Sequence, residues 1–206
     1  GGDVPAFKGY KPSHHSSPYP ASLITSINSE VVHGIPKVDK ILKEGDIISL
    51  DLGIKHKGMF TDHAITVAVG KISKADQELL AVTKEALIAG ISSIIPNKTT
   101  TGDLGFLIST YAKKSGYGIV RDLSGHGVGV HIHEDPFIPN YGKKGKGDVF
   151  RTGMVVAIEP MFNYGRDGIV VDKDGYTVRT ADGTKSAHFE HTIAITDEGV
   201  EILTIF

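Results

Sequence analysis

Ser124-Gly-His-Gly-Val-Gly-Val-His-Ile-His-Glu-Asp-Pro136 contains three histidines, three glycines and two carboxylates within thirteen residues, and no other stretch of the chain is as rich in reactive groups. The glycines beside His126 permit backbone conformations and close approaches that a β-carbon would forbid. A turn of this kind can present an imidazole to a ligand. By itself, Gly-His-Gly is more typical of a glycine-rich turn with solvated histidines, so its meaning depends on residues elsewhere in the chain.

The composition is that of an ordinary globular protein. Its 206 residues are 40% hydrophobic and 22% charged, with a formal net charge of −2, and this length suffices for one domain or two closely packed halves. A nearly neutral chain has no general attraction for nucleic acids or anionic lipids. The lack of cysteine excludes disulfides and suits a reducing compartment, and no apolar run is long enough to cross a membrane. We therefore expect a cytoplasmic protein with no nucleic-acid specificity and no membrane association.

The order of predicted elements indicates an α+β domain. Residues 1–22 lack periodicity and predict an extended lead-in, in which the pair His14 and His15 belongs to a solvated loop. Two helices are expected, one over 74–95 capped by Ser73 and one from Thr101 to Gly116. Period-two and turn signals predict strands at 23–35 (two short strands), 47–54, 59–69, 154–160, 168–172, 176–180 and 187–195.

The strands at 47–54 and 59–69 predict a hairpin that carries two carboxylates. If the hairpin turns about His56-Lys57, Asp51 lies directly opposite Asp62, with β-carbons about 4.5 to 5.5 Å apart. Two carboxylates so close in an apolar sheet repel each other, so either one is protonated or a cation lies between them. A slip of one residue in the register would separate the pair.

Carboxylates interrupt hydrophobic strands at four positions, Asp51, Asp62, Glu159 and Glu190. A single one could be explained by a helix cap or a salt bridge, but lysine and arginine are scarce around all four, which favours a multivalent cation as the counter-charge. Together with His126, this set of oxygen and imidazole ligands suits a pair of first-row divalent ions. Such a pair activates water and polarises a carbonyl group, as amide hydrolysis requires.

The spacing of these five residues, with their local motifs, resembles that of the methionine aminopeptidases of pita-bread fold. Glu159 lies in Ile-Glu-Pro and Glu190 in His-Phe-Glu-His-Thr, and the run Ile27-Asn-Ser-Glu-Val-Val-His-Gly-Ile-Pro36 is similar to the family's segment before the first aspartate. The resemblance extends from Tyr19 to the C-terminus. It implies two pseudo-two-fold halves, roughly 23–100 and 101–206, around a curved antiparallel sheet within a single catalytic domain, 23–206.

Two features place the resemblance within the type I branch. Xaa-Pro peptidases of the same fold share the five ligands but usually have arginine where this chain has Phe189. Glu190 follows Glu159 by only 31 residues, which leaves no room for the helical insertion of type II enzymes. An Xaa-Pro peptidase and a catalytically inactive binding module remain the alternatives.

The resemblance also implies a ligand set and a cofactor, two divalent ions drawn from Co, Mn, Fe or Zn. Asp62 and Glu190 would bridge the two ions and Asp51 would chelate one of them. His126 and Glu159 would complete the other. The substrates implied are N-termini of nascent polypeptides and peptides, with transient ribosome association as a further expectation.

Further residues acquire roles from the same resemblance. Glu159 would accept a proton from the attacking water, His133 would stabilise the developing oxyanion, and His33 would contact the scissile amide nitrogen. His131 and His191 match no catalytic position, so we expect packing or neighbouring roles for them.

The expected pocket for the methionine side chain is lined by Tyr19, Ile24, Ile132 and Tyr176. The family commonly has cysteine, phenylalanine and tryptophan at the last three of these positions. The replacements keep the pocket apolar but change its volume, so methionine selectivity is less firmly implied than hydrolysis. The family's usual N-terminal helices are absent here, which predicts a fragment, a partner that supplies them, or a minimal variant.

Overall fold

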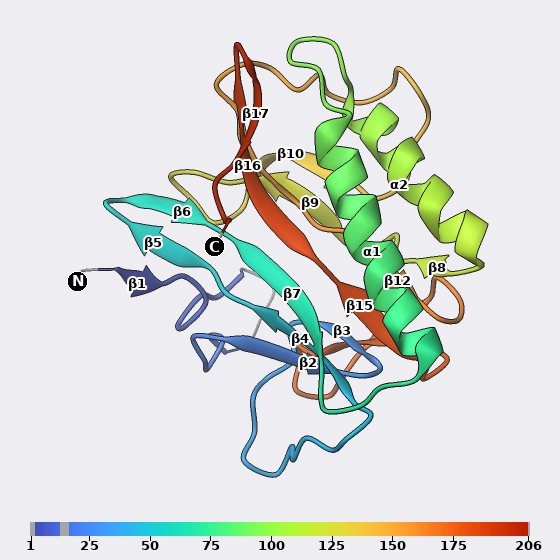
Figure 1. Ribbon diagram of the computed structural model, residues 1–206. Helices are drawn as coiled ribbons and strands as arrows, with labels where there is room; N and C mark the ends of the chain where they lie inside the picture. The colour runs from blue at the N-terminus through green and yellow to red at the C-terminus, as the bar shows by residue number, and fades with distance from the viewer. Residues whose placement is uncertain (1–2, 13–16, 206) are drawn as a thin grey trace.

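The computed structural model describes residues 3–12 and 17–205. Figure 1 shows the elements, which are β1 (Val4–Pro5), β2 (Ile24–Ile27), β3 (Glu30–Val32), β4 (Ile47–Asp51), β5 (Ile54–His56), β6 (Met59–Thr61), β7 (His63–Ala68), α1 (Lys74–Ser92), α2 (Thr101–Ser115), β8 (Gly118–Ile119), β9 (Ser124–Gly127), β10 (Glu134–Pro139), β11 (Val155–Ile158), β12 (Met161–Asn163), β13 (Ile169–Val171), β14 (Val178–Thr180), β15 (Ser186–His188), β16 (Glu190–Thr196) and β17 (Gly199–Ile202). The loop predicted at His14 and His15 lies outside the described residues. None of the described helices is long and apolar enough to span a bilayer.

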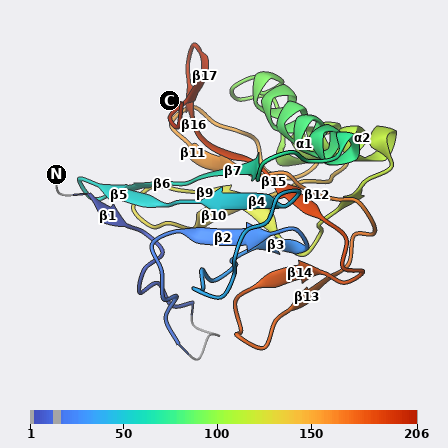
Figure 2. The same cartoon turned by 60° about the horizontal axis from the view of Figure 1, so that its bottom comes forward.

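An eight-stranded antiparallel sheet forms the centre of the fold, in the order β10-β9-β11-β16-β7-β4-β2, with β17 paired to β16. The sheet is curved, and both helices pack on one of its faces (Figure 1). The β13–β14 hairpin and the loop that follows β1 lie on the other side (Figure 2). This arrangement confirms the expected α+β class and curved antiparallel sheet.

The pairing of β7 with β16 joins the strands that precede the helices to those that follow them. Only two residue pairs make this ladder, Ala64 with Glu190 and His63 with His191. The other strand pairs between β4 and β9 lie to either side of this seam. On one side β4 pairs with β7, and on the other side β16 pairs with β11, which pairs with β9. Two predicted metal ligands, Asp62 and Glu190, therefore lie at or beside the seam.

The helices follow from their capping residues and apolar stripes. The Ser73 side chain caps α1 by accepting from the Asp76 N–H, and Thr100 with Asp103 forms a capping box on α2. The first helix ends at Ser92 rather than at residue 95, because a residue before a proline disfavours helical conformation and Ile95 donates its N–H to Thr99 Oγ1 instead. Leucines and isoleucines on the buried stripes pack onto the sheet and form the main core.

The predicted register of the first hairpin is wrong by two residues. The turn consists of Lys57 and Gly58, both with positive φ (48° and 90°), as a two-residue type I′ turn requires. Asp51 is consequently opposite Ala64 and not opposite Asp62. A shift of two residues keeps the same face of the sheet, so both carboxylates still point to one side.

The N-terminal segment is more than the extended lead-in that the sequence predicts. Strand β1 pairs with β5, and the Ala6 N–H donates to the carbonyl of Gly53. Phe7 and Tyr19 are buried in an apolar cluster with residues from later in the chain. The segment therefore forms part of the walls of the site described next.

Candidate metal centre

The five predicted ligands lie on five neighbouring strands. Read across the sheet from β9 to β4, they are His126 in β9, Glu159 just after β11, Glu190 at the start of β16, Asp62 just before β7 and Asp51 at the end of β4. All five line one cavity of about 240 Å³. Side chains up to 139 positions apart in the sequence thus meet because their strands are adjacent.

The ligand atoms form two overlapping groups. The carboxylates of Asp51, Asp62 and Glu190 offer oxygens within 4.8 Å of one another, and His126, Glu159 and Glu190 do the same. The His126 Nε2 atom lies 3.5 Å from Oε1 of Glu159. Since Glu190 belongs to both groups, the geometry suits two cation positions that share a carboxylate.

The electrostatics of the cavity call for a cation. Asp51, Asp62 and Glu190 are at most 6% exposed, and no lysine or arginine is among the described residues that line the cavity. Burial, and then the neighbouring carboxylates, raises the pKa of Asp51 and Glu190 well above the usual range, and burial raises that of Asp62 to about 7. Asp51 Oδ1 and Glu190 Oε1 are buried without a hydrogen-bond donor. Acceptor atoms left in this state fit divalent metal ions.

Hydrogen bonds to the backbone fix the positions of two of the ligands, Asp62 and His126. Thr192 Oγ1 accepts from the Asp62 N–H at 2.8 Å and donates to its carbonyl at 2.7 Å, which attaches the break between β6 and β7 to β16. The His126 Nδ1–H donates to the Gly127 carbonyl at 2.9 Å. That bond leaves the Nε2 lone pair of His126 free to bind a metal.

The glycines of the quoted stretch are required by close packing. A β-carbon on Gly125 would lie 2.4 Å from the carbonyl oxygen of Ala157, and one on Gly127 would lie 2.2 Å from that of Asp135. Neither carbonyl can move without breaking its strand. The predicted close approach around His126 is therefore present.

His188 is a component that the sequence reasoning missed. It is 2% exposed, and its Nε2 lies 3.6 Å from Glu159 Oε2 and 3.8 Å from Glu190 Oε2. Burial, followed by His33 and His63, lowers the pKa of His188 to about 3, so the ring is neutral. Its position two residues before Glu190 was the available signal.

A second, more apolar cavity of about 440 Å³ adjoins the first. The predicted pocket residues Tyr19, Ile24 and Tyr176 line it, whereas Ile132 packs behind them in the same apolar cluster. The lining also includes residues that the sequence did not indicate, namely Phe7, Tyr10, Pro12, Leu123 and Phe137. Three of these come from the N-terminal segment, which carries no periodic signal.

His33 and His133 lie where the two cavities meet and line both of them. His33 has a positive φ of 58°. The backbone of the next residue, Gly34, is held by two hydrogen bonds. Its carbonyl accepts from the Tyr19 hydroxyl at 2.8 Å, and its N–H donates to Ser26 Oγ at 3.1 Å. The His133 ring is 4.5 Å from that of His126, centroid to centroid.

The two remaining histidines of the motifs lie outside both cavities. His131 is exposed, and its N–H donates to Glu134 Oε1 at 2.6 Å. His191 stacks on His63 with ring centroids 4.8 Å apart and bonds to Thr204. Both therefore have the neighbouring or packing positions that we expected.

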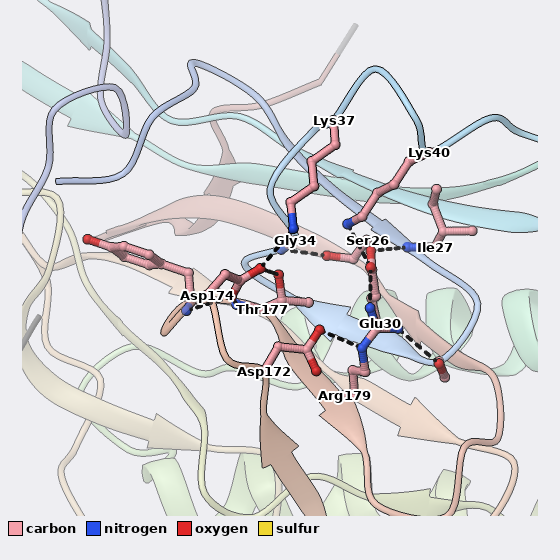
Figure 3. A network of polar contacts seen from close by, with 12 residues as sticks. Ser26, Ile27, Glu30, Gly34, Lys37, Lys40, Asp172, Asp174, Thr177 and Arg179 are labelled. Carbon is pink, nitrogen blue, oxygen red and sulfur yellow. Dashed lines mark hydrogen bonds and ion pairs between the residues drawn. The ribbon is translucent and has the colours of Figure 1, made fainter. Parts of the chain in front are cut away.

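An ion network around the buried carboxylate of Glu30 supports the wall of the apolar cavity (Figure 3). Glu30, only 2% exposed, accepts from Arg179 Nη2 at 2.8 Å and lies 2.6 Å from Lys40 Nζ. Arg179 Nε also donates to Asp172 at 2.7 Å. Because Lys40 follows the His33 turn and Arg179 belongs to β14, the network joins these two walls.

The loop that carries Tyr176 is closed by Asp174. Its Oδ1 accepts from the N–H groups of Tyr176 and Thr177 at 3.0 and 2.9 Å, and its other oxygen lies 3.5 Å from Lys37 Nζ (Figure 3). The Tyr176 hydroxyl donates to the Ser17 carbonyl at 2.6 Å. The hairpin tip and the N-terminal segment are thus tied together over the cavity.

Comparison with known proteins gives one consistent set of relatives. The model of metallopeptidase family M24 matches residues 6–197. The chain is 49% identical over 205 residues to a methionine aminopeptidase of Aquifex aeolicus, covering 98% of this chain and 79% of the relative, and 46% identical over 203 residues to methionine aminopeptidase 1 of Bacillus subtilis, with 98% and 79% covered.

Solved structures agree with these sequence matches. The methionine aminopeptidase of Thermotoga maritima superimposes with a TM-score of 0.94 at 46% identity, covering 99% of this chain and 79% of that one. A prolidase from Pyrococcus furiosus is more distant, with a TM-score of 0.70, 26% identity and coverage of 93% and 50%. The likeness to both confirms the pita-bread fold.

Proposed function

This chain belongs to metallopeptidase family M24 and to its methionine aminopeptidases, and on that premise we propose that its centre holds two divalent metal ions for the hydrolysis that removes an N-terminal methionine. The enzyme is a metalloaminopeptidase. The observation that carries the proposal is the meeting of five ligands, four of them buried and Glu159 partly buried, in a cavity whose described lining contains no lysine or arginine, beside an apolar cavity.

The overlapping groups support Glu190 as a ligand of both ions, and the family resemblance adds Asp62 as the second shared ligand. Asp51 would bind one ion, His126 and Glu159 the other, and Asp62 and Glu190 both. When bound, the ions supply Lewis-acid activation of a water molecule and of the substrate carbonyl. Their number, and their identity among Co, Mn, Fe and Zn, are part of the proposal.

Residues of the chain would move the proton and stabilise charge. Glu159, buried among acidic neighbours, would accept a proton from the attacking water and deliver it to the departing amine nitrogen. His133 would donate a hydrogen bond to the carbonyl oxygen as negative charge develops there. His33, across the junction of the cavities, would contact the scissile nitrogen.

The apolar cavity would bind the methionine side chain. Methionine is unbranched and its polarisable sulfur makes favourable contacts with aromatic ring edges, which Tyr19 and Tyr176 supply as a perpendicular pair with centroids 5.2 Å apart. Ile24 lies beside them. Ile132 would shape the pocket from behind.

We assign the substrates to nascent polypeptide and peptide N-termini and propose transient ribosome association in the cytoplasm, where such chains emerge. Residues 23–206 would form the single catalytic domain. The segment before it would complete the substrate pocket through Phe7, Tyr10 and Tyr19.

The decisive experiment compares Met-Ala-Ser with an Xaa-Pro dipeptide as substrates of the Mn²⁺-loaded chain. We expect release of methionine from the tripeptide only, its loss with a chelator, and its loss in Glu159→Ala but not in a matched surface variant, Glu198→Ala. Preferential cleavage of Xaa-Pro would support the prolidase alternative. Full activity of Glu159→Ala, or no metal binding by the wild type, would contradict the proposal.

A further inference from the structure

Tyr10, in the N-terminal segment, makes a direct hydrogen bond to His133. Its hydroxyl oxygen lies 2.9 Å from Nδ1 of the imidazole, across 123 residues of sequence. The two rings also touch, with centroids 5.3 Å apart and planes inclined by 52°. The other nitrogen of His133 is therefore the one left for a substrate.

The position of Tyr10 is set by its backbone and by buried neighbours. Its N–H donates to the carbonyl of Phe7 at 2.9 Å, and its carbonyl accepts from the N–H of Tyr19 at 2.8 Å. Phe7 is 6% exposed and Tyr19 3% exposed. The hydroxyl is thus held in place by the same apolar cluster that builds the pocket.

The direction of the hydrogen bond follows from acid–base chemistry. Burial, and then Tyr176, raises the pKa of Tyr10, so its hydroxyl keeps its proton. The ring nitrogen of His133 that faces this hydroxyl is Nδ1, at 2.9 Å. A phenol is a stronger donor than a neutral imidazole N–H, and a bare imidazole nitrogen is a stronger acceptor than a phenol oxygen. The favoured bond is O–H to Nδ1, with the imidazole proton on Nε2.

We propose that Tyr10 is a positioning residue that holds His133 in the Nε2–H tautomer and directs this N–H toward the scissile carbonyl. The inference rests on the proposed function. In the other tautomer, a nitrogen lone pair would face the oxygen that acquires negative charge, and the transition state would lose a donor.

The contrast with His126 supports this assignment. His126 Nδ1 faces a backbone carbonyl, which can only accept, so His126 has a bare Nε2 suited to a metal. His133 Nδ1 faces a hydroxyl, which can donate. Asp62, His126 and His133 offer atoms within 4.8 Å of one another, so His133 could itself become a ligand. By donating to Nδ1, the Tyr10 hydroxyl keeps the proton of His133 on Nε2, so that Nε2 can donate to the substrate and has no lone pair for a metal ion.

Steady-state kinetics test the role in catalysis. With Met-Ala-Ser and the Mn²⁺-loaded enzyme, Tyr10→Phe should lower kcat by about 10- to 100-fold while KM changes by less than about threefold. Tyr111→Phe, on α2 outside both cavities, is the matched control. In a His133→Ala background, Tyr10→Phe should cause no further loss. An equal loss in both backgrounds, or no loss in the wild-type background, would overturn the proposal.

Nitrogen-15 NMR of the metal-free wild-type chain tests the tautomer without any reaction. His133, assigned through a His133→Gln variant, should show a bare Nδ1 and a protonated Nε2, and Tyr10→Phe should shift it toward a mixture. A protonated Nδ1 in the wild type would overturn the proposal. Because this measurement needs no substrate, it separates a failure of the inference from a failure of the proposed function, and the wild-type spectrum decides even if the variant does not fold.

Discussion

Asp62→Asn should remove a pH-dependent penalty from the stability of the metal-free chain. Burial raises the pKa of Asp62 from 3.8 to about 7, so the folded carboxyl keeps its proton to a higher pH than the unfolded one. The unfolded chain therefore loses that proton first, and the free energy of unfolding falls as the pH rises from about 4 to about 7. An asparagine cannot ionise and makes no contribution to this fall.

The two pKa values also give the size of the effect. One pKa unit corresponds to about 1.4 kcal/mol, so the penalty on the wild type above pH 7, which Asp62 shares with the neighbouring carboxyl of Asp51, is on the order of 4 kcal/mol. In a chain of this length, that difference shifts the Tm by roughly 8 to 16 °C. In thermal unfolding with EDTA, the difference in Tm between variant and wild type should therefore be roughly 8 to 16 °C larger at about pH 7.5 than at about pH 5.

The comparison with the variant is needed because buried imidazoles act in the opposite direction. Burial lowers the pKa of His126 and His188, so their contribution to the free energy of unfolding rises with pH up to about 6.5. Both histidines are present in the wild type and in the variant, so this contribution cancels when the two are compared. Mn²⁺ should reverse the wild-type trend, since ligands bind it deprotonated. A gap that stays constant or narrows between the two pH values would refute the reasoning.

Three further substitutions have defined outcomes. Gly127→Ala places a β-carbon 2.2 Å from the Asp135 carbonyl and should prevent folding or cost more than about 3 kcal/mol in urea titration. Gly145→Ala has open space and only the strain of a positive φ of 69°, so it should cost about 1 to 2 kcal/mol. Glu30→Gln removes the carboxylate shared by two partly exposed cations, Lys40 and Arg179, and should cost about 1 to 3 kcal/mol and raise the KM for Met-Ala-Ser. Thr192→Val removes both bonds to the Asp62 backbone and should weaken Mn²⁺ binding, measured by calorimetry, about 10- to 100-fold. Unchanged affinity would contradict that role.

The carboxylates that meet in the first cavity could be predicted to need a partner because they break a strong pattern. A carboxylate in an apolar strand, such as Glu159 or Glu190, has no place in a core without a partner, so its position is visible in the sequence. The cap of α1 was visible for a similar reason, since Ser73 satisfies a backbone group locally, whereas the Thr100–Asp103 box on α2 was found only in the structure.

The parts that could not be predicted depend on backbone geometry or on distant contacts. The register error arose because Lys57 adopts a positive φ, a conformation that is uncommon for lysine and that the sequence therefore does not indicate. Tyr10 was missed because its partner, His133, is remote in sequence and because the N-terminal segment has no periodicity to mark its buried residues. His188 looked like an ordinary strand residue beside a stronger motif.

The two-residue ladder between β7 and β16 determines when the enzyme can become active during its own synthesis. Glu190 supplies an oxygen to both ligand groups, and it reaches them only after β16 has been translated and paired with β7. Neither ligand group is complete before that moment, although Asp51 and Asp62 are synthesised well before β16. A metal ion held by either complete group would therefore report that β7 and β16 have paired.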